Sequence, residues 1–351
     1  MRKQKVIITN DIEKELSKIL SEIHYSSIFI LTDNTTKELC LPAIVQTKEL
    51  QQAKIIEVKS GDENKNIEAL SGIWKYLCEN GATRKSLTIN LGGGMITDLG
   101  GFAASTFKRG MDYINIPTTL LGAIDAAVGG KTGINFMGLK NEIGVINPAG
   151  YVLIDPGFFK TLDKNNFLSG YAEILKHSLI HSDEELTETL NFDLENIDYN
   201  ELSRLLKRSV AIKEAIVEKD PKEQNIRKAL NFGHTIGHAF ESFSHETGKP
   251  VLHGYAVAYG IICELYLSCR KVNFPTDKLQ QICRFLVNNY GHFQITCKHY
   301  ERLYELMTHD KKNESKEINF TLLRNVGDIC INQTANEKEI FDSLDFYRDF
   351  F

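Results

Sequence analysis

The chain has 351 residues, of which 42% are hydrophobic and 25% are charged, with only 7 prolines. This length is typical of two domains, and the composition excludes a disordered, collagen-like or fibrous protein. The 41 Lys and Arg and 46 Asp and Glu give a net charge of −5, so no basic field attracts nucleic acid or a membrane surface, and any anion site must be local.

Neither the N-terminal segment nor the cysteines indicate export. The first residues are basic but lack an apolar stretch of signal-peptide length, and the longest apolar region, residues 251–267, is interrupted by His253 and Glu264. The seven cysteines form no C-x-x-C pair, so neither a disulfide framework nor a thiolate zinc site is expected. We therefore expect a cytoplasmic protein with buried, reduced cysteines.

Short apolar runs alternate with helical patterns in the first part of the chain. The runs predict strands at residues 5–9, 27–33, 54–58, 86–91, 113–117 and 151–155, with helices at 66–80 and 95–107. Such alternation is typical of an α/β domain with a largely parallel, Rossmann-like sheet, here residues 1–162. From residue 163 to 351 the spacing predicts a mostly helical domain, with a β-like stretch at 317–333 and a final helix from Glu337.

A glycine run in SLTINLGGGMITDLGGF places Gly92, Gly93 and Gly94 between a strand and a helix. Backbone without side chains can approach a pyrophosphate there, and helix-start amides can bind it. The alternative is a plain tight turn, because Thr97 replaces the third glycine of G-x-G-x-x-G. Asp98 and Asp125 lie in similar apolar, glycine-containing contexts and could serve the cofactor or cap helices.

A second cluster, DAAVGGKTGINFMGLKN, places Lys131, Lys140 and Asn141 among what we interpret as flexible turns. Lysine is a compact charge suited to a phosphate or carboxylate. Solvated loop lysines are the alternative.

Three histidines and a glutamate lie in apolar helical segments. His234 and His238 are four residues apart on one helix face, His253 precedes another helix, and Glu173 and Lys176 share a third. A Glu and two His would form a catalytic type of zinc site with an open position. Spacing alone favours His234 and His238 as the ligand pair, and histidines of an ordinary core are the alternative.

Taken in order, these segments resemble the 3-dehydroquinate synthase family, within the sugar-phosphate cyclases, from about residue 32 to residue 312. The matching segments are LGGGMITDLGGFAAS, RGMDYINIPTTLLGAIDAAVGGKTGIN, KNEIG, SGYAEILKHSLI, LNFGHTIGHA and LHGYAVAYG. The resemblance implies an NAD⁺ and Zn²⁺ enzyme, with Co²⁺ as an alternative metal. It converts 3-deoxy-D-arabino-heptulosonate 7-phosphate to 3-dehydroquinate by oxidation, phosphate elimination, reduction and an intramolecular aldol step.

The resemblance also implies a role for each matching residue. The metal ligands become Glu173, His234 and His253. The substrate phosphate meets Lys131, Asn141, Asn231, His238 and Lys311 or Lys312, with Arg109 from a neighbouring subunit, which implies a homodimer. Lys213 and Arg227 hold the carboxylate, and Asp125, Lys140 and Lys176 hold hydroxyls. NAD⁺ meets Asp33, Asp62, Lys65, Gly93, Gly94, Asp98, Thr118, Thr119, Phe158 and Thr161.

The chain departs from the family pattern at several positions. Asp62 stands where Glu is usual, Asn225 and Ile226 replace Gly and Leu before Arg227, and Leu139 replaces a Gly. Tyr255 stands where a Glu is usual, and it would remove an outer partner of the metal site.

We consider three alternatives to a function in this family. A sibling cyclase acting on a substrate without a carboxylate would not need Lys213 and Arg227. A metal-dependent alcohol dehydrogenase would not need the phosphate cluster, and a non-catalytic descendant is expected to lose metal ligands or Lys176.

Overall fold

The computed structural model describes residues 4–137, 139–308 and 318–350. The chain forms two compact units. The first, here the α/β unit, comprises Met1–Asp163 and Tyr199–Lys207, and the second, the helical unit, comprises Lys164–Asp198 and Arg208–Phe351.

The α/β unit is built on a six-stranded parallel sheet with the order β1-β8-β5-β4-β2-β3. Its strands are β1 (Lys5–Ile8), β2 (Ile28–Asp33), β3 (Lys54–Val58), β4 (Leu87–Gly92), β5 (Asp112–Pro117) and β8 (Tyr151–Ile154). Every residue of β4 is buried, as expected where helices cover both faces of a parallel sheet. The six predicted strands and the α/β class are confirmed.

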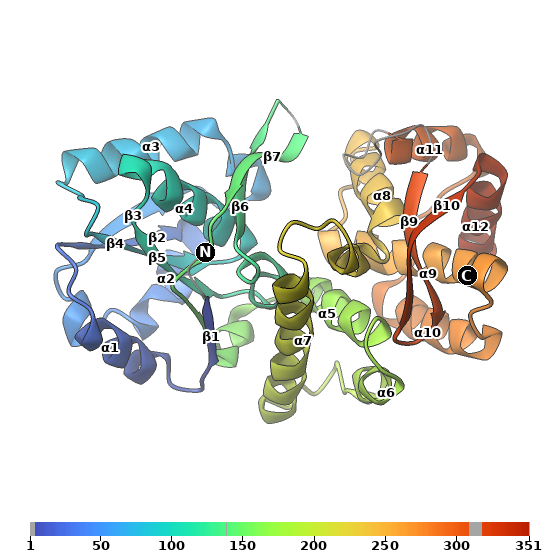
Figure 1. The fold of residues 1–351 in the computed structure, drawn as a ribbon, viewed down its shortest axis with the longest axis horizontal. Helices are drawn as coiled ribbons and strands as arrows, with labels where there is room; N and C mark the ends of the chain where they lie inside the picture. The colour runs from blue at the N-terminus through green and yellow to red at the C-terminus, as the bar shows by residue number, and fades with distance from the viewer. Residues whose placement is uncertain (1–3, 138, 309–317, 351) are drawn as a thin grey trace. The chain divides into compact units, whose positions relative to one another are not determined.

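Helices cover the two faces of this sheet. They are α1 (Ile12–Glu22), α2 (Asn34–Leu39), α3 (Ile67–Glu79) and α4 (Gly94–Thr106). Helices α3 and α4 lie together on one face and α1 lies on the other (Figure 1). Across the sheet, the chain moves in one direction from β1 through β2 to β3, and in the opposite direction from β3 through β4 to β5. Because such crossovers are right-handed, the two directions place their helices on opposite faces. The direction changes beside β2 and β4, and ligands of such sheets bind where the carboxyl ends of strands meet this change.

Two strands, β6 (Lys131–Phe136) and β7 (Leu139–Ile146), pair as an antiparallel hairpin. The prediction of flexible turns is therefore wrong over most of this segment. Gly133 and Gly144 face each other in the hairpin, and a Cβ on Gly144 would lie 2.1 Å from the Thr132 carbonyl oxygen. Glycines at such a close approach interrupt the alternation of apolar and polar residues by which a strand is recognised.

The helical unit surrounds α9 (His253–Val272), which contacts α5, α8, α10, α12 and β9. Its other elements are α5 (Lys164–Leu179), α6 (Asp183–Asn191), α8 (His234–Glu246), α10 (Thr276–Tyr290), α11 (Tyr300–Thr308), α12 (Glu337–Asp349) and the hairpin of β9 (Ile318–Asn325) and β10 (Asp328–Ala335). Helix α7 (Tyr199–Lys219) contributes to both units. The mostly helical prediction and the final helix are confirmed, and the predicted β-like stretch forms the hairpin of β9 and β10.

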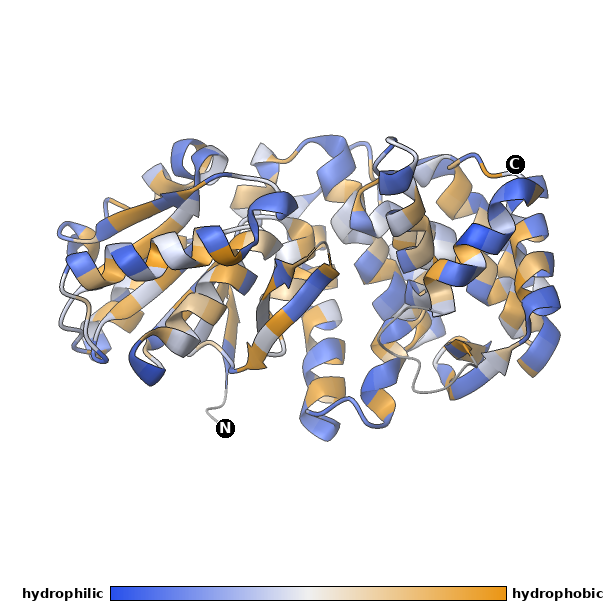
Figure 2. Ribbon diagram, turned by 90° about the horizontal axis from the view of Figure 1, so that it is seen from above, coloured by the Kyte–Doolittle hydropathy of each residue, from blue (hydrophilic) through white to orange (hydrophobic). Residues whose placement is uncertain are grey.

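Hydrophobic and hydrophilic residues alternate around the helices of both units, as expected for helices packed on a core (Figure 2). Among the described residues, no helix is both long enough and apolar enough to cross a membrane.

All seven cysteines are free thiols. Cys40, Cys263 and Cys283 are buried, but Cys78 and Cys297 are exposed, so the expectation that all are buried is wrong.

Candidate active site

Three side chains from three helices of the helical unit converge on one point. Glu173 comes from α5, His234 from the start of α8 and His253 from the start of α9, and their donor atoms all lie within 4.8 Å of one another. The Glu173 Oε1 atom lies 3.4 Å from His234 Nε2 and 3.9 Å from His253 Nε2. Ligand atoms of a tetrahedral zinc site are about 3.3 Å apart, given bonds of about 2.0 Å. The spacing therefore fits one small divalent cation.

The Glu173 carboxylate is completely buried, and its two oxygens have different surroundings. Its Oε2 atom accepts a hydrogen bond from the ammonium group of Lys176, which is itself 1% exposed. Its Oε1 atom is buried and accepts no hydrogen bond from any described residue. A buried carboxylate oxygen without a donor is unfavourable unless something else neutralises it, and a cation between Oε1 and the two imidazoles would do so.

Hydrogen bonds set the same orientation for both imidazoles. The Nδ1 atom of His234 lies 3.0 Å from the Phe232 carbonyl oxygen, and Nδ1 of His253 lies 3.2 Å from Glu241 Oε2. Both partners are acceptors, so each Nδ1 must carry a proton and donate it. This tautomer leaves a lone pair on each Nε2, the nitrogen that faces Glu173.

Glycines bring the three helices close enough for this convergence. A Cβ on Gly254, next to His253, would lie 1.9 Å from the Ser169 carbonyl oxygen on α5. A Cβ on Gly260 would lie 2.0 Å from the Gly233 carbonyl oxygen, directly before α8. The backbone of α9 therefore touches the backbones beside Glu173 and His234.

His238 lies one turn beyond His234 on α8, with its ring 5.3 Å from that of His234 and 5.8 Å from that of His253. It forms a second possible metal-binding group with Glu241 and His253. The described groups do not include the pair favoured by spacing, His234 with His238. Helical spacing places two side chains on one face, but the nitrogen each presents depends on contacts from other helices.

Further polar groups of the helical unit are buried as well. Lys213 and Arg227 are each less than 5% exposed, which is rare for these residue types. Arg227 donates to the Pro221 carbonyl oxygen at 2.9 Å, and the Asn231 amide donates to Glu223 Oε1 at 2.8 Å. Lys311 and Lys312 lie outside the described residues.

In the α/β unit, several predicted cofactor residues meet at the carboxyl ends of the strands. Asp33 ends β2, and its Oδ1 atom accepts from the backbone amides of Thr35 and Thr36, so it caps α2. The buried thiol of Cys40 interacts with Thr118, after β5, and Thr161, after β8, and burial raises its pKa to about 11. Residues from three strand ends thus surround one buried thiol.

A second polar group contains Lys65, which is 5% exposed. Its ammonium lies 3.0 Å from Asp98 Oδ2, 2.7 Å from Asn141 Oδ1 and 3.4 Å from Asp62 Oδ1. Lys140 lies 3.8 Å from Asp62. Burial raises the pKa of Asp98 to about 6, although Lys65 opposes this effect. Three predicted cofactor residues, Asp62, Lys65 and Asp98, therefore form one network with the predicted substrate residues Lys140 and Asn141.

Neither Asp98 nor Asp125 caps a helix, so that alternative is wrong for both. Asp98 lies inside α4, and Asp125 lies inside the short helix η5 (Gly122–Ala126). Helix α4 begins at Gly94 with Gly93 as its N-cap, and no side chain caps it. The first amides of α4 thus have no side-chain acceptor at the carboxyl end of β4.

The remaining predicted residues of the α/β unit follow β5 or β8, or lie on the hairpin of β6 and β7. Thr119 accepts from the Gly122 amide at 3.0 Å, and a Cβ on Gly93 would lie 3.0 Å from the Thr119 methyl group. Phe158 is buried in η6 (Pro156–Thr161), after β8, and Lys131 is exposed at the start of β6.

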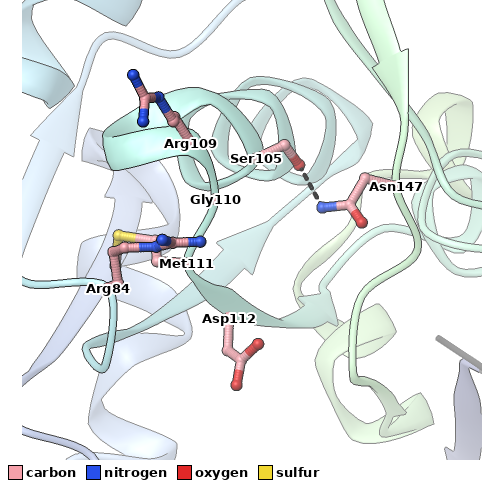
Figure 3. A pocket seen from close by; sticks show the side chains of 7 residues that line it. All are labelled: Arg84, Ser105, Arg109, Gly110, Met111, Asp112 and Asn147. Carbon is pink, nitrogen blue, oxygen red and sulfur yellow. Dashed lines mark hydrogen bonds between the residues drawn. The ribbon is translucent and has the colours of Figure 1, made fainter. Parts of the chain in front are cut away.

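Arg109 lies at the opposite edge of the sheet. It precedes β5, whereas the carboxyl end of that strand is at Pro117, roughly 17 Å away for a six-residue strand. With Arg84 it lines a cavity of about 470 Å³ in which Asn147 donates to Ser105 Oγ at 2.8 Å (Figure 3). Lys108 and Arg109 have φ values of 49° and 69°, a conformation that costs energy for residues with a side chain.

Two glutamates that contact the histidine segments, Glu241 and Glu264, are absent from the predicted site residues. Glu241 follows His238 by three residues on α8, a spacing that could have indicated it. Glu264 is a lone carboxylate in an apolar helix and accepts from the Gly233 amide at 2.6 Å. Tyr255 donates to Asn165 Oδ1 at 3.0 Å, so Glu241 rather than residue 255 provides a carboxylate for His253.

Two family models and a relative of similar length match this chain. The model of the 3-dehydroquinate synthase N-terminal family matches residues 55–169, and that of the C-terminal family matches residues 170–313. A 3-dehydroquinate synthase from Parabacteroides distasonis is 54% identical over 351 residues, covering 100% of this chain and 99% of the relative.

Solved structures show the same fold at low sequence identity. A 2-deoxy-scyllo-inosose synthase complexed with carbaglucose-6-phosphate, NAD⁺ and Co²⁺ has a TM-score of 0.85 at 21% identity, covering 98% of this chain and 96% of its own. A 2-epi-5-epi-valiolone synthase from Streptomyces hygroscopicus, with NAD⁺ and Zn²⁺ bound, has a TM-score of 0.84 at 23% identity, covering 99% of this chain and 98% of its own.

Proposed function

Because the chain belongs to the 3-dehydroquinate synthase family and catalyses its reaction, a carbon–oxygen lyase step that releases phosphate, we propose which residues hold the metal, the dinucleotide and the substrate. The substrate is 3-deoxy-D-arabino-heptulosonate 7-phosphate and the product is 3-dehydroquinate. One observation carries the proposal. His234 and His253 converge on Glu173 Oε1, a buried carboxylate oxygen that accepts no hydrogen bond from any described residue.

The metal site uses one carboxylate oxygen and two imidazole nitrogens. Glu173 Oε1 and the Nε2 atoms of His234 and His253 would be the ligands, a set of three protein donors that is typical of catalytic zinc sites. Zn²⁺ or Co²⁺ bound there would polarise the substrate oxygen. Lys176 holds the second oxygen of Glu173, which fixes the carboxylate and keeps an ammonium group beside the proposed metal site.

The dinucleotide site uses the carboxyl ends of β2, β4 and β5. The uncapped first turn of α4 at Gly93 and Gly94 fits a pyrophosphate, because its amides have no side-chain acceptor. Asp33 keeps Oδ2 for ribose hydroxyls, since Oδ1 makes its capping bonds. NAD⁺ bound there supplies hydride transfer and is regenerated in each turnover.

The substrate carboxylate and phosphate are assigned to different residues. Lys213 and Arg227 bind the carboxylate, and their burial gives a strong interaction because little water competes. Lys131, Asn141, Asn231 and His238 bind the phosphate with Lys311 or Lys312, while Lys140 and Asp125 hold hydroxyls. Asp62, Lys65, Asp98, Thr118, Thr119, Phe158 and Thr161 complete the cofactor site.

The enzyme acts as a homodimer in which Arg109 serves the phosphate site of the neighbouring subunit. Support comes from its place at the edge of the sheet opposite the carboxyl ends of the strands. A cytoplasmic location is proposed as well, in accord with seven free thiols.

One assay tests the reaction. The purified chain is incubated with the heptulosonate phosphate, catalytic NAD⁺ and Zn²⁺, and both phosphate and NADH are followed. Release of phosphate without net NADH supports the proposal. NADH that accumulates without phosphate release would indicate a dehydrogenase instead, and turnover of hexose phosphates without a carboxylate would indicate a sibling cyclase.

Mixing two inactive variants tests the role of Arg109. Arg109→Ala and His253→Ala proteins, mixed equally and allowed to exchange subunits, would form half heterodimers, each with one complete site. About a quarter of wild-type activity is expected from this counting. No recovered activity, with exchange verified by mass, would place Arg109 outside the neighbouring site.

A further inference from the structure

Glu264 is a fully buried carboxylate on α9 that the site described above does not use. Its Oε2 atom accepts the backbone N–H of Gly233 at 2.6 Å, and its Oε1 atom accepts that of Ile236 at 3.2 Å. Both amides belong to the start of α8. Two oxygens of one side chain thus bind the first turn of a neighbouring helix.

These two amides are those of the N-cap and N3 positions of α8. In a capping box, the N-cap side chain binds the N3 amide and the N3 side chain binds the N-cap amide. Here the N-cap is Gly233, which has no side chain, and N3 is the apolar Ile236. The carboxylate of Glu264 satisfies both amides from another helix.

Position 233 cannot easily carry a capping residue of its own. Gly233 has φ of +78°, a conformation that L side chains rarely adopt, and a Cβ there would lie 2.5 Å from Ile261 Cγ1. The close contact of α8 with α9 requires glycine at this point. A cap for α8 therefore has to come from elsewhere.

His234 is the first residue of α8 and directly follows Gly233. Its imidazole also bonds back to the Phe232 carbonyl oxygen, so its direction depends on the backbone of residues 232–234. We propose that Glu264 is a positioning residue, which holds this backbone so that His234 Nε2 stays at the ligand position. The inference rests on the proposed metal site and adds a residue to its support.

Metal affinity is sensitive to small displacements of a ligand. Ligand distances in metal sites vary by only about 0.2 Å, and loss of a group that orients a ligand commonly weakens binding 10- to 100-fold. Without Glu264, the Gly233 and Ile236 amides would lose buried acceptors and the first turn of α8 would loosen. Weaker metal binding follows even though Glu264 touches no metal.

The test compares three full-length variants after removal of metal. Glu264→Leu removes both acceptors at similar volume, and Glu264→Gln keeps one acceptor oxygen. Ser268→Ala is the control, because Ser268 is buried on the same helix and accepts a backbone amide from Leu323 of β9 rather than from α8. Each protein is titrated with Co²⁺, and its visible absorption spectrum and thermal midpoint are recorded.

Glu264→Leu should raise the Co²⁺ Kd about 10- to 100-fold and alter the Co²⁺ absorption bands. Glu264→Gln should give a smaller rise, and it keeps the test decisive if the Leu variant does not fold. Ser268→Ala should lower the thermal midpoint without changing the Kd or the spectrum. Wild-type Kd and spectrum in both Glu264 variants, or an equal loss of affinity in Ser268→Ala, would overturn the inference. Absence of Co²⁺ binding in the wild type would instead overturn the metal site itself.

Discussion

The contact between Gly254 and Ser169 gives a direct test of how helix packing builds the metal site. In Gly254→Ala the new methyl group would lie 1.9 Å from the Ser169 carbonyl oxygen, whereas ordinary contact begins at 3.4 Å. The obstructing atom is backbone, so the start of α9 and α5 must separate by about 1.5 Å rather than adjust a side chain.

That separation acts directly on two proposed ligands. His253 Nε2 already lies 3.9 Å from Glu173 Oε1, somewhat more than the about 3.3 Å between ligands of one zinc ion. A further displacement of about 1.5 Å exceeds the tolerance of about 0.2 Å in ligand distances, so we expect at least a 100-fold rise in the Zn²⁺ Kd, or about 3 kcal/mol. Competition with a chromophoric chelator measures this Kd, and circular dichroism shows whether the variant is folded.

Two controls separate the metal effect from a general loss of stability. Gly72→Ala lies in a helix of the α/β unit where a Cβ meets nothing within 4 Å, so it should leave Zn²⁺ binding unchanged. Ser169→Ala removes only the hydrogen bond from the Gly254 amide to Ser169 Oγ, at 3.0 Å, and should have a smaller effect than Gly254→Ala. A folded Gly254→Ala protein with wild-type Zn²⁺ affinity would refute the reasoning.

Three further outcomes follow from the site. His253→Ala should abolish bound zinc and activity but leave the fold intact; one zinc per chain measured by elemental analysis would remove His253 from the metal. Arg227→Ala should mainly raise the KM for the carboxylate-bearing substrate, and unchanged steady-state constants would contradict this role. Burial raises the pKa of Asp98 to about 6 in the folded chain, against an ordinary value of 3.8, so the contribution of this group to stability is fully present below pH 3.8 and is lost as pH rises through 6. Asp98→Asn should therefore gain stability relative to wild type between pH 4 and 7, by about 1–3 kcal/mol, and urea unfolding that shows no such trend would contradict the raised pKa.

The α/β character of the first part of the chain and the helical character of the second could be predicted because their signals are local. In β4 the apolar Leu87, Ile89 and Leu91 recur at every second residue, and α3 and α4 extend over more than ten residues each. The hairpin of β6 and β7 was missed because Gly133 and Gly144 replace the side chains that would have shown the alternation. Hydrophobic periodicity predicts a strand from its side chains, so it fails where close backbone contact requires glycine.

The candidate site was predictable only in part for a related reason. The residue types Glu173, His234, His238 and His253 are visible in the sequence, but helical spacing favoured His238 over His253 as the partner of His234. The structure brings the Nε2 atoms of His234 and His253 toward Glu173 because Phe232 and Glu241 accept from their Nδ1 atoms. Which nitrogen a histidine presents depends on tertiary contacts that no spacing encodes.

The position of Glu264 in the sequence predicts a buried polar contact without identifying the partner. A carboxylate inside the apolar α9 is unfavourable alone, so its presence indicates a buried partner somewhere. The partner is a helix start without a side-chain cap, and that start lacks a cap because close contact between α8 and α9 requires Gly233. Gly233 permits the close packing of α8 and α9 but cannot cap α8, and Glu264 supplies the missing acceptors. Replacing Glu264 should therefore leave the start of α8 without a cap.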